Sequence, residues 1–115
     1  MAYKIRVLEK RPGEKPRVRE IDNNLDVMQE IVDGYIQVVY PFKDRVGLVC
    51  NEDGKLIGLA PNILLKSGGR AYDFVCGTLL LCGLGGEDFE DMPEGLIDKY
   101  EKLLNRWAFK SLNFC

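Results

Sequence analysis

The sequence predicts an α+β fold with a mixed, mostly antiparallel sheet of about five to six strands and two main helices. Two observations lead to this class. Short stretches that alternate polar and apolar residues, or are rich in β-branched and aromatic residues, are separated by turns containing Pro and Gly. Only two stretches have apolar residues at helical spacing, and no β-α-β series indicates a doubly wound sheet.

The first elements are an N-terminal hairpin. Residues 3–8 alternate between polar and apolar side chains, which is typical of a strand with one wet face. Residues 11–16 contain two prolines and a glycine and predict a turn. Residues 18–21 return as the second strand, so the hairpin closes before residue 22.

A helix and a third strand follow. Asp22 or Asn23 is expected to cap the helix, because a side-chain oxygen can accept from its free backbone N–H groups. Apolar residues recur at helical spacing over 25–32, and Gly34 is expected just beyond the helix end. Residues 35–40 are β-branched and aromatic and predict a strand.

The middle of the chain predicts a second hairpin. Residues 45–50 read as a strand, 51–54 as a strong turn signal and 55–59 as the returning strand. Residues 61–65 are expected to form one helical turn, and 67–69 a flexible loop.

The last part contains the most apolar segment. Residues 72–84 are expected to be the central strand, with Thr78 inside it. Pro93 is expected at the first position of the second helix. We expect a single domain over residues 1–104 and an apolar tail over 105–115, docked on its own or a partner subunit; the tail's large apolar residues are Trp107, Phe109, Leu112 and Phe114.

Composition argues against common catalytic sites. The 115 residues include no histidine, one threonine and two serines. The chain therefore lacks the usual general base and excludes a Ser-His or Cys-His nucleophilic pair within itself. We expect a protein that is not an enzyme and that needs no cofactor.

The four cysteines and the N-terminus indicate a cytoplasmic protein. The cysteines lack C-x-x-C spacing and the chain has no histidine that could complete a metal site with them, so no metal site is expected. Three of them, Cys50, Cys76 and Cys82, lie in apolar stretches and are expected to be buried free thiols, as in other cytosolic proteins. No signal peptide is evident at the N-terminus, and no apolar stretch is long enough to span a membrane.

Charge is unevenly distributed along the chain. The net charge of −2 argues against direct nucleic-acid binding. Residues 1–19 nevertheless contain seven basic and two acidic residues, and residues 84–101 contain seven acidic residues and one lysine. The basic segment is either a face for phosphates or a solvated surface. The acidic segment is either a mimic of nucleic acid or a solvated surface.

One group of residues suits a nucleotide-like ligand. Arg and Lys hold phosphates, Asn can pair with the edge of a base, and aromatic rings can stack on it. The alternative is that the asparagines are turn and cap residues and the aromatics belong to the core. The candidate ligand-binding residues are Arg45, Asn51, Asn62, Lys66, Arg70, Tyr35, Tyr40, Tyr72, Asp73 and Thr78.

Several segments, taken in order over roughly residues 3–104, resemble one family of short proteins. The family is classed as a domain of unknown function and is common in phages and mobile elements of Gram-positive bacteria. The segments that carry the resemblance are residues 3–9, 16–22, 34–42, 49–59, Pro61-Asn62, Gly77-Thr78 and 85–89.

The resemblance implies a setting in counter-defence. Some small phage proteins, such as the Sequestin-like sponges, bind nucleotide signals of host immunity, and this is an argument by analogy. We therefore expect a homo-oligomer, a dimer or larger, that sequesters a cyclic ADP-ribose isomer or a cyclic dinucleotide without catalysis. The alternative is a protein–protein inhibitor whose acidic segment binds a host defence or DNA-handling protein.

Overall fold

The computed structural model describes residues 3–110 and contains eight strands and two helices in this range. They are β1 (Lys4–Lys10), β2 (Arg17–Asp22), α1 (Leu25–Val32), β3 (Ile36–Val39), β4 (Val46–Asn51), β5 (Pro61–Ser67), β6 (Arg70–Cys76), β7 (Leu79–Leu84), β8 (Phe89–Glu90) and α2 (Glu94–Trp107).

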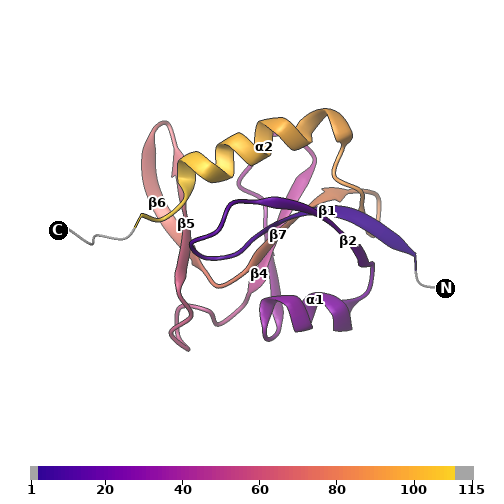
Figure 1. Ribbon diagram of the computed structural model, residues 1–115, viewed down its shortest axis with the longest axis horizontal. Helices are drawn as coiled ribbons and strands as arrows, with labels where there is room; N and C mark the ends of the chain where they lie inside the picture. The colour runs from indigo at the N-terminus through magenta and orange to yellow at the C-terminus, as the bar shows by residue number, and fades with distance from the viewer. Residues whose placement is uncertain (1–2, 111–115) are drawn as a thin grey trace.

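Six strands form the main sheet, in the order β2-β1-β7-β4-β3, with β8 paired to β7. The strands β5 and β6 form a separate two-stranded sheet (Figure 1). Every strand pair in the described residues is antiparallel. The α+β prediction, with its six-stranded sheet and two helices, is confirmed.

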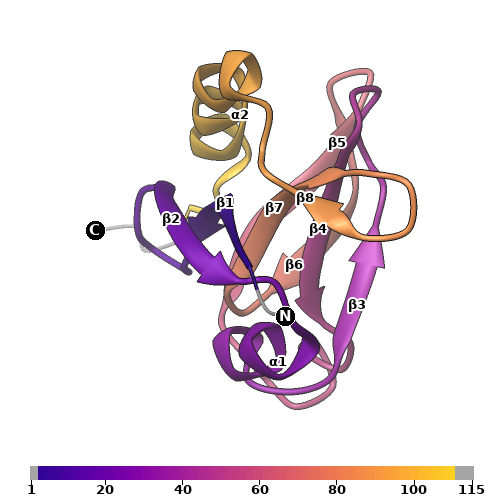
Figure 2. The same cartoon turned by 90° about the vertical axis from the view of Figure 1, so that its right-hand side faces the viewer.

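The main sheet lies between two layers (Figure 2). Helix α1 covers one face, where Met28 and Val32 pack in a core with residues of β1, β2, β4 and β7. Helix α2 and the β5–β6 hairpin cover the other face, where Tyr100, Leu104 and Ile63 join a second core. Strand β7 is sandwiched between these layers, which explains why it is almost entirely apolar.

The expected central strand over 72–84 is wrong, because the chain breaks between β6 and β7. Gly77 has a φ of 86°, a left-handed conformation that glycine adopts without strain. Its carbonyl accepts a hydrogen bond from the Asn62 amide, which fixes the break. The two halves consequently belong to different sheets, and Thr78 lies at the bend instead of inside the central strand.

The expected pairing of 45–50 with 55–59 is also wrong. Residues 52–58 form successive turns, and β4 pairs with β3 and β7. The second hairpin is β5–β6, so 61–65 is part of a strand instead of a helical turn. The loop at Gly68 and Gly69 is its tight turn, with φ values of 58° and 78° that suit a two-residue hairpin connection.

Helix α1 spans the predicted residues 25–32, but the cap residues of both helices differ from those predicted. Asn24 caps α1, and its side-chain oxygen accepts from the Val27 amide at 2.9 Å. The cap residue that follows the helix is Asp33, which takes the left-handed conformation expected of Gly34. Pro93 is the cap residue of α2 instead of its first helical residue.

The apolar side chains near the C-terminus begin to dock on the chain's own core. Trp107 ends α2 and stacks on Phe42, with ring centroids 5.9 Å apart. The Phe109 amide donates to the carbonyl of Asn62 in β5 at 2.7 Å. Leu112 and Phe114, the other large apolar residues of the expected tail, lie outside the described residues.

The described cysteines are buried free thiols, as predicted. Burial raises the pKa of Cys50 to about 11 and that of Cys82 to about 12. Cys115 lies outside the described residues. Neither helix in residues 3–110 is long and apolar enough to cross a membrane.

Gly83 of β7 lies so close to the segment after β8 that we expect it not to tolerate a side chain. A Cβ at Gly83 would lie 2.1 Å from the Asp91 carbonyl oxygen, so Gly83→Ala must push the two segments apart. We expect a loss of about 2 kcal/mol in the free energy of unfolding, measured by urea denaturation. The matched control Gly86→Ala meets no atom within 4 Å and should change it by less than about 0.5 kcal/mol. Equal losses in both variants would contradict the packing explanation.

Candidate functional site

The predicted ligand-binding residues are spread over several parts of the molecule. Asn51 and Asp73 line the same pocket, and Tyr40 lines a different one. Arg45 lies just before β4 and donates to the carbonyl of Gly85, just after β7, at 3.4 Å. The other predicted residues line neither of these pockets: Tyr35 lies before β3, Asn62 and Lys66 in β5, Arg70 and Tyr72 in β6, and Thr78 at the bend before β7.

Asn51 holds the end of α1. Its amide nitrogen donates to the carbonyls of Val32 and Asp33 at 3.0 Å, and its oxygen accepts from the Asp53 amide at 2.8 Å. These bonds satisfy carbonyls that the helix leaves unpaired at its C-terminus. Gly34 leaves room for this contact, because a Cβ there would lie 2.7 Å from the Asn51 amide nitrogen.

Asn62 is also occupied by structural contacts. Its amide nitrogen donates to the carbonyls of Lys10 and Gly77 at 2.7 and 2.8 Å, and its oxygen accepts from the Lys10 ammonium at 2.9 Å. The ammonium also donates to the Arg11 carbonyl. Burial lowers the pKa of Lys10. For both asparagines the structural alternative holds, since their side chains cap and brace the fold.

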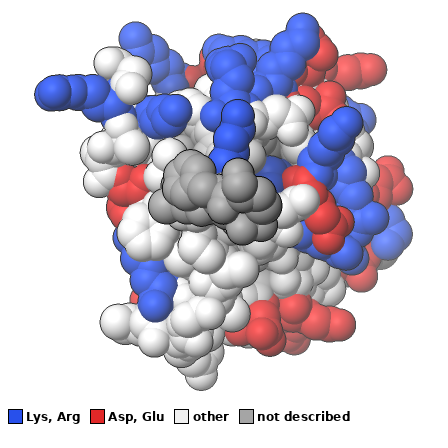
Figure 3. All heavy atoms as spheres, turned by 60° about the vertical axis from the view of Figure 1, so that its left-hand side comes forward, with Lys and Arg blue, Asp and Glu red and all other residues white. Residues whose placement is uncertain are grey.

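The predicted tyrosines are not core residues. Tyr35, Tyr40 and Tyr72 are all more than half exposed. Leu56 and Ile57, in the turns after β4, are also exposed. Figure 3 shows a broad uncharged area below a zone where Lys and Arg side chains gather.

A pocket of about 270 Å³ lies between the turns after β4 and strand β6. Its apolar lining includes Leu65 and Val75, which belong to the buried core. The Lys55 ammonium pairs with the Asp73 carboxylate and lies 4.6 Å from the centre of the Phe74 ring. The pocket therefore combines an apolar base, an aromatic ring and an ion pair.

The carboxylate at this pocket is well suited to accept hydrogen bonds. The hydrogen bond from Lys55 lowers the pKa of Asp73, and the bond from the Phe74 amide at 2.8 Å lowers it further. Glu52 and Asp53 also line the pocket, so acidic side chains outnumber Lys55. The pocket consequently favours a neutral or hydroxyl-bearing group over a phosphate.

The sequence offered no clear signal for Lys55. It follows the predicted turn at 51–54 and lies in the returning strand predicted over 55–59. The chain instead continues in turns, which bring Lys55 to Asp73 of β6. The contact could not be predicted from local patterns, because Lys55 and Asp73 are distant in sequence and meet only in the fold.

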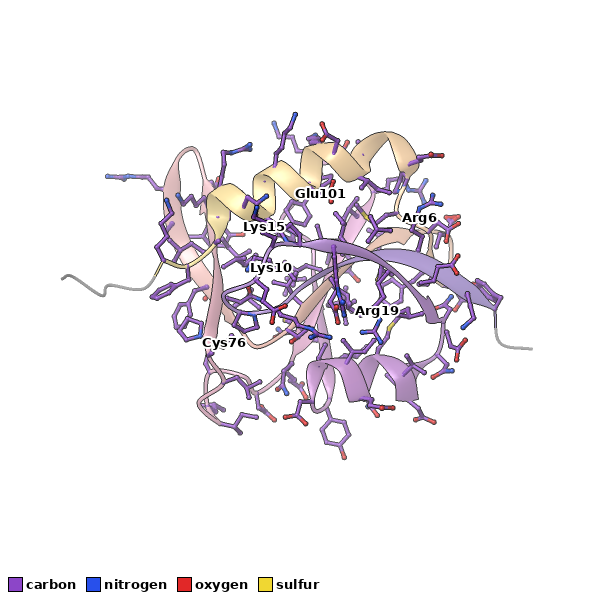
Figure 4. The ribbon with its side chains drawn as sticks, viewed as in Figure 1. Arg6, Lys10, Lys15, Arg19, Cys76 and Glu101 are labelled. Carbon is purple, nitrogen blue, oxygen red and sulfur yellow. The ribbon has the colours of Figure 1, made fainter. Side chains whose placement is uncertain are left out.

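A second charged cluster, termed here the arginine cluster, consists of Arg11, Arg17 and Arg19 around Glu9. Glu9 is only 2% exposed, and its two oxygens accept from Arg17 Nε at 2.7 Å and from Arg19 Nη1 at 2.8 Å. Arg11 Nε lies 3.6 Å from the same carboxylate. In Figure 4, Arg19 lies between the β1–β2 hairpin and α1.

The pKa of Glu9 reflects opposing effects. Burial raises it, but hydrogen bonds and charges from Arg17 and Arg19 outweigh burial, so the pKa lies below its ordinary value of 4.5. The carboxylate is therefore ionised at neutral pH. The basic N-terminal segment is thus partly neutralised from within.

Glu9 predicts a specific acid sensitivity. Because its pKa is lowered on folding, its stabilisation is present above pH 4.5 and is lost as the pH falls through the lowered value. We expect Glu9→Gln to cost about 1–2 kcal/mol at pH 7 and to show a shallower loss of stability below pH 4.5 than the wild type. Urea denaturation across this range measures both effects. The exposed Glu20→Gln is the matched control, and identical pH profiles for wild type and Glu9→Gln would contradict the prediction.

Comparison with models of known protein families gives a match over most of the chain. The model of a domain of unknown function, DUF3846, matches residues 5–105. No curated protein and no solved structure matches the chain significantly. The match spans both layers and the whole main sheet, and it supports the resemblance to a family classed as a domain of unknown function. The chain therefore belongs to the DUF3846 family.

Proposed function

We propose that the chain is a non-catalytic binding protein that sequesters a nucleotide-derived signal, such as a cyclic ADP-ribose isomer or a cyclic dinucleotide. The observation that supports it is the pocket beside β6, which combines Phe74, an ionised Asp73 and an apolar base. On this proposal the protein is a cytoplasmic accessory factor of a phage or mobile element. By analogy with Sequestin-like sponges, it acts as a homo-oligomer that keeps the signal from its receptor.

The pocket chemistry fits the nucleoside part of such a ligand. An aromatic ring can stack on any type of nucleotide base, and Phe74 is partly exposed at the pocket. A carboxylate can accept from ribose hydroxyls, and Asp73 carries one at the rim. On this proposal the phosphates of the ligand lie outside the pocket, because its acidic side chains outnumber Lys55.

The thiols at the pocket argue for binding over catalysis. Cys50 and Cys76 both line it. Burial raises the pKa of both thiols, that of Cys50 to about 11, so each is protonated and weakly nucleophilic at neutral pH. With no histidine in the chain to activate them, these groups are better suited to line a ligand than to attack it.

Calorimetry with cyclic ADP-ribose, its glycosidic isomers and the cyclic dinucleotides tests this proposal. We expect one member to bind, and Asp73→Asn to weaken it about tenfold, because the uncharged amide accepts hydroxyl hydrogen bonds more weakly. Glu30→Gln, the same charge change on the exposed side of α1, should leave affinity unchanged. Absence of binding across the panel would contradict the function. Equal affinity in Asp73→Asn, with native circular dichroism, would contradict the pocket.

A second candidate function rests on the acidic segment. Glu87 and Asp88 are exposed in the connection between β7 and β8, and Glu90 and Glu94 are exposed nearby in sequence. Within residues 3–110 none of these four carboxylates forms an ion pair. Free carboxylates of this kind favour a basic partner, so we propose as the alternative that the protein inhibits a host defence or DNA-handling protein.

Capture from host lysate distinguishes this alternative. The variant with Glu87, Asp88 and Glu90 changed to lysine should lose a specific partner that the wild type retains, because its charge complementarity is reversed. A variant with Asp26 and Glu30 of α1 changed to lysine is the matched control. Retention of the same partner by both variants would argue against the acidic segment as an interface.

A further inference from the structure

The arginine cluster is built on two paired strands. Glu9 of β1 lies directly opposite Arg17 of β2, and Val7 lies opposite Arg19. Side chains two residues apart along a strand share a face, so Arg17 and Arg19 lie on the same face as Glu9. Val7 packs in the core beneath α1, which places this face on the α1 side of the sheet.

Most hydrogen-bond donors of the cluster remain free. A guanidinium carries five N–H donors in a planar fork. Within residues 3–110, the hydrogen bonds of Arg17 and Arg19 side chains are the single bonds to Glu9 from Nε and Nη1. The side chains of Arg11, Arg17 and Arg19 are 45%, 55% and 37% exposed, so their remaining donors can reach solvent.

The charges of the cluster do not balance. Three guanidinium groups surround one carboxylate, and Glu9 is only 2% exposed. Glu20 follows Arg19 in β2 and points to the opposite face of the strand. The solvent side of the cluster therefore presents excess positive charge and oriented donors.

We propose that Arg11, Arg17 and Arg19, positioned by the buried Glu9, form a binding site for a phosphate group of a small molecule. Guanidinium forks match phosphate oxygens bidentately, which a lysine cannot do. Glu9 restrains the long side chains before the ligand arrives, so less conformational entropy is lost on binding. This site is separate from the pocket beside β6, because none of its four residues lines that pocket.

A small phosphate compound fits the observations better than a nucleic acid. The cluster is one compact group on a hairpin. A protein that binds a nucleic acid instead carries basic residues along a stripe or groove. The whole chain also carries a net charge of −2. Electrostatic repulsion from the rest of the surface therefore disfavours a long polyanion but costs a single phosphate little.

The test uses the wild-type protein labelled with ¹⁵N. The side-chain Nε–H resonances of its arginines are followed while inorganic phosphate replaces chloride at constant ionic strength. We expect the resonances of Arg11, Arg17 and Arg19 to shift together with one dissociation constant, and those of Arg45 and Arg70 to stay in place. Absence of any shift, or equal shifts at all arginines, would overturn the proposal.

Two variants carry the same test further. Arg17→Gln should weaken phosphate binding about tenfold, because it removes a charged donor from the cluster. Arg106→Gln, the same change at an exposed position of α2, should leave the affinity within about twofold. Native circular dichroism and equal phosphate affinity in both variants would contradict the site. If Arg17→Gln fails to fold, the wild-type titration still tests the proposal.

A final arm identifies the source of the phosphate. Adenosine monophosphate binding more tightly than inorganic phosphate would indicate an organic phosphate, and equal affinity would indicate the free ion; either supports the site. A short DNA duplex that shifts the same resonances at lower concentration than both would overturn the small-molecule assignment.

Discussion

Two consecutive buried charges at the end of β1 hold the layers of this protein together. Glu9 and Lys10 are each 2% exposed, and successive residues of a strand point to opposite faces. Glu9 gathers arginines of β2 on the α1 side, whereas Lys10 reaches Asn62 of β5 on the other side (Figure 4). One strand end thereby fixes both the edge of the main sheet and the position of the β5–β6 hairpin.

The candidate pocket depends on the Lys10 side of this arrangement. Asn62 bonds to Lys10 and also to the Gly77 carbonyl, at the point where the chain leaves β6 and enters β7. The break at Gly77 lets β6 pair with β5 instead of continuing in the main sheet. Strand β6 then forms one wall of the pocket with Asp73 and Phe74. A buried polar network of this kind is stable only while every member is satisfied.

Local sequence patterns predicted the elements whose partners are near in sequence. The β1–β2 hairpin, α1 and α2 follow from alternation, helical spacing and capping residues, and each lies where expected to within a few residues. The β5–β6 hairpin was missed, because the turn signal at 51–54 suggested an immediate return, whereas residues 52–58 form successive turns that lead to β5. The break at Gly77 was also missed, because the segment from Tyr72 to Leu84 is mostly apolar and a single glycine within it does not specify a new sheet.

The site was less predictable than the fold for a related reason. Asn51 and Asn62 have side chains that could bind the edge of a base, but their donors and acceptors are already hydrogen-bonded within the fold. Asp73 was predicted and lies at the pocket, while its partner Lys55 depends on the hairpin that the patterns missed. The basic segment was noted as a possible phosphate face, yet the buried Glu9 that organises it became evident only from the pairing of β1 with β2.

The central claim is that this protein holds a nucleotide-derived ligand and leaves it chemically unchanged. The most direct measurement saturates the protein with the member of the cyclic ADP-ribose or cyclic dinucleotide panel that binds, denatures the complex by heat and analyses the released compound by mass spectrometry. The proposal predicts full recovery of the ligand at its original mass and retention time. Release of a hydrolysed or rearranged product, absent from a heated control without protein, would contradict it and make the protein an enzyme.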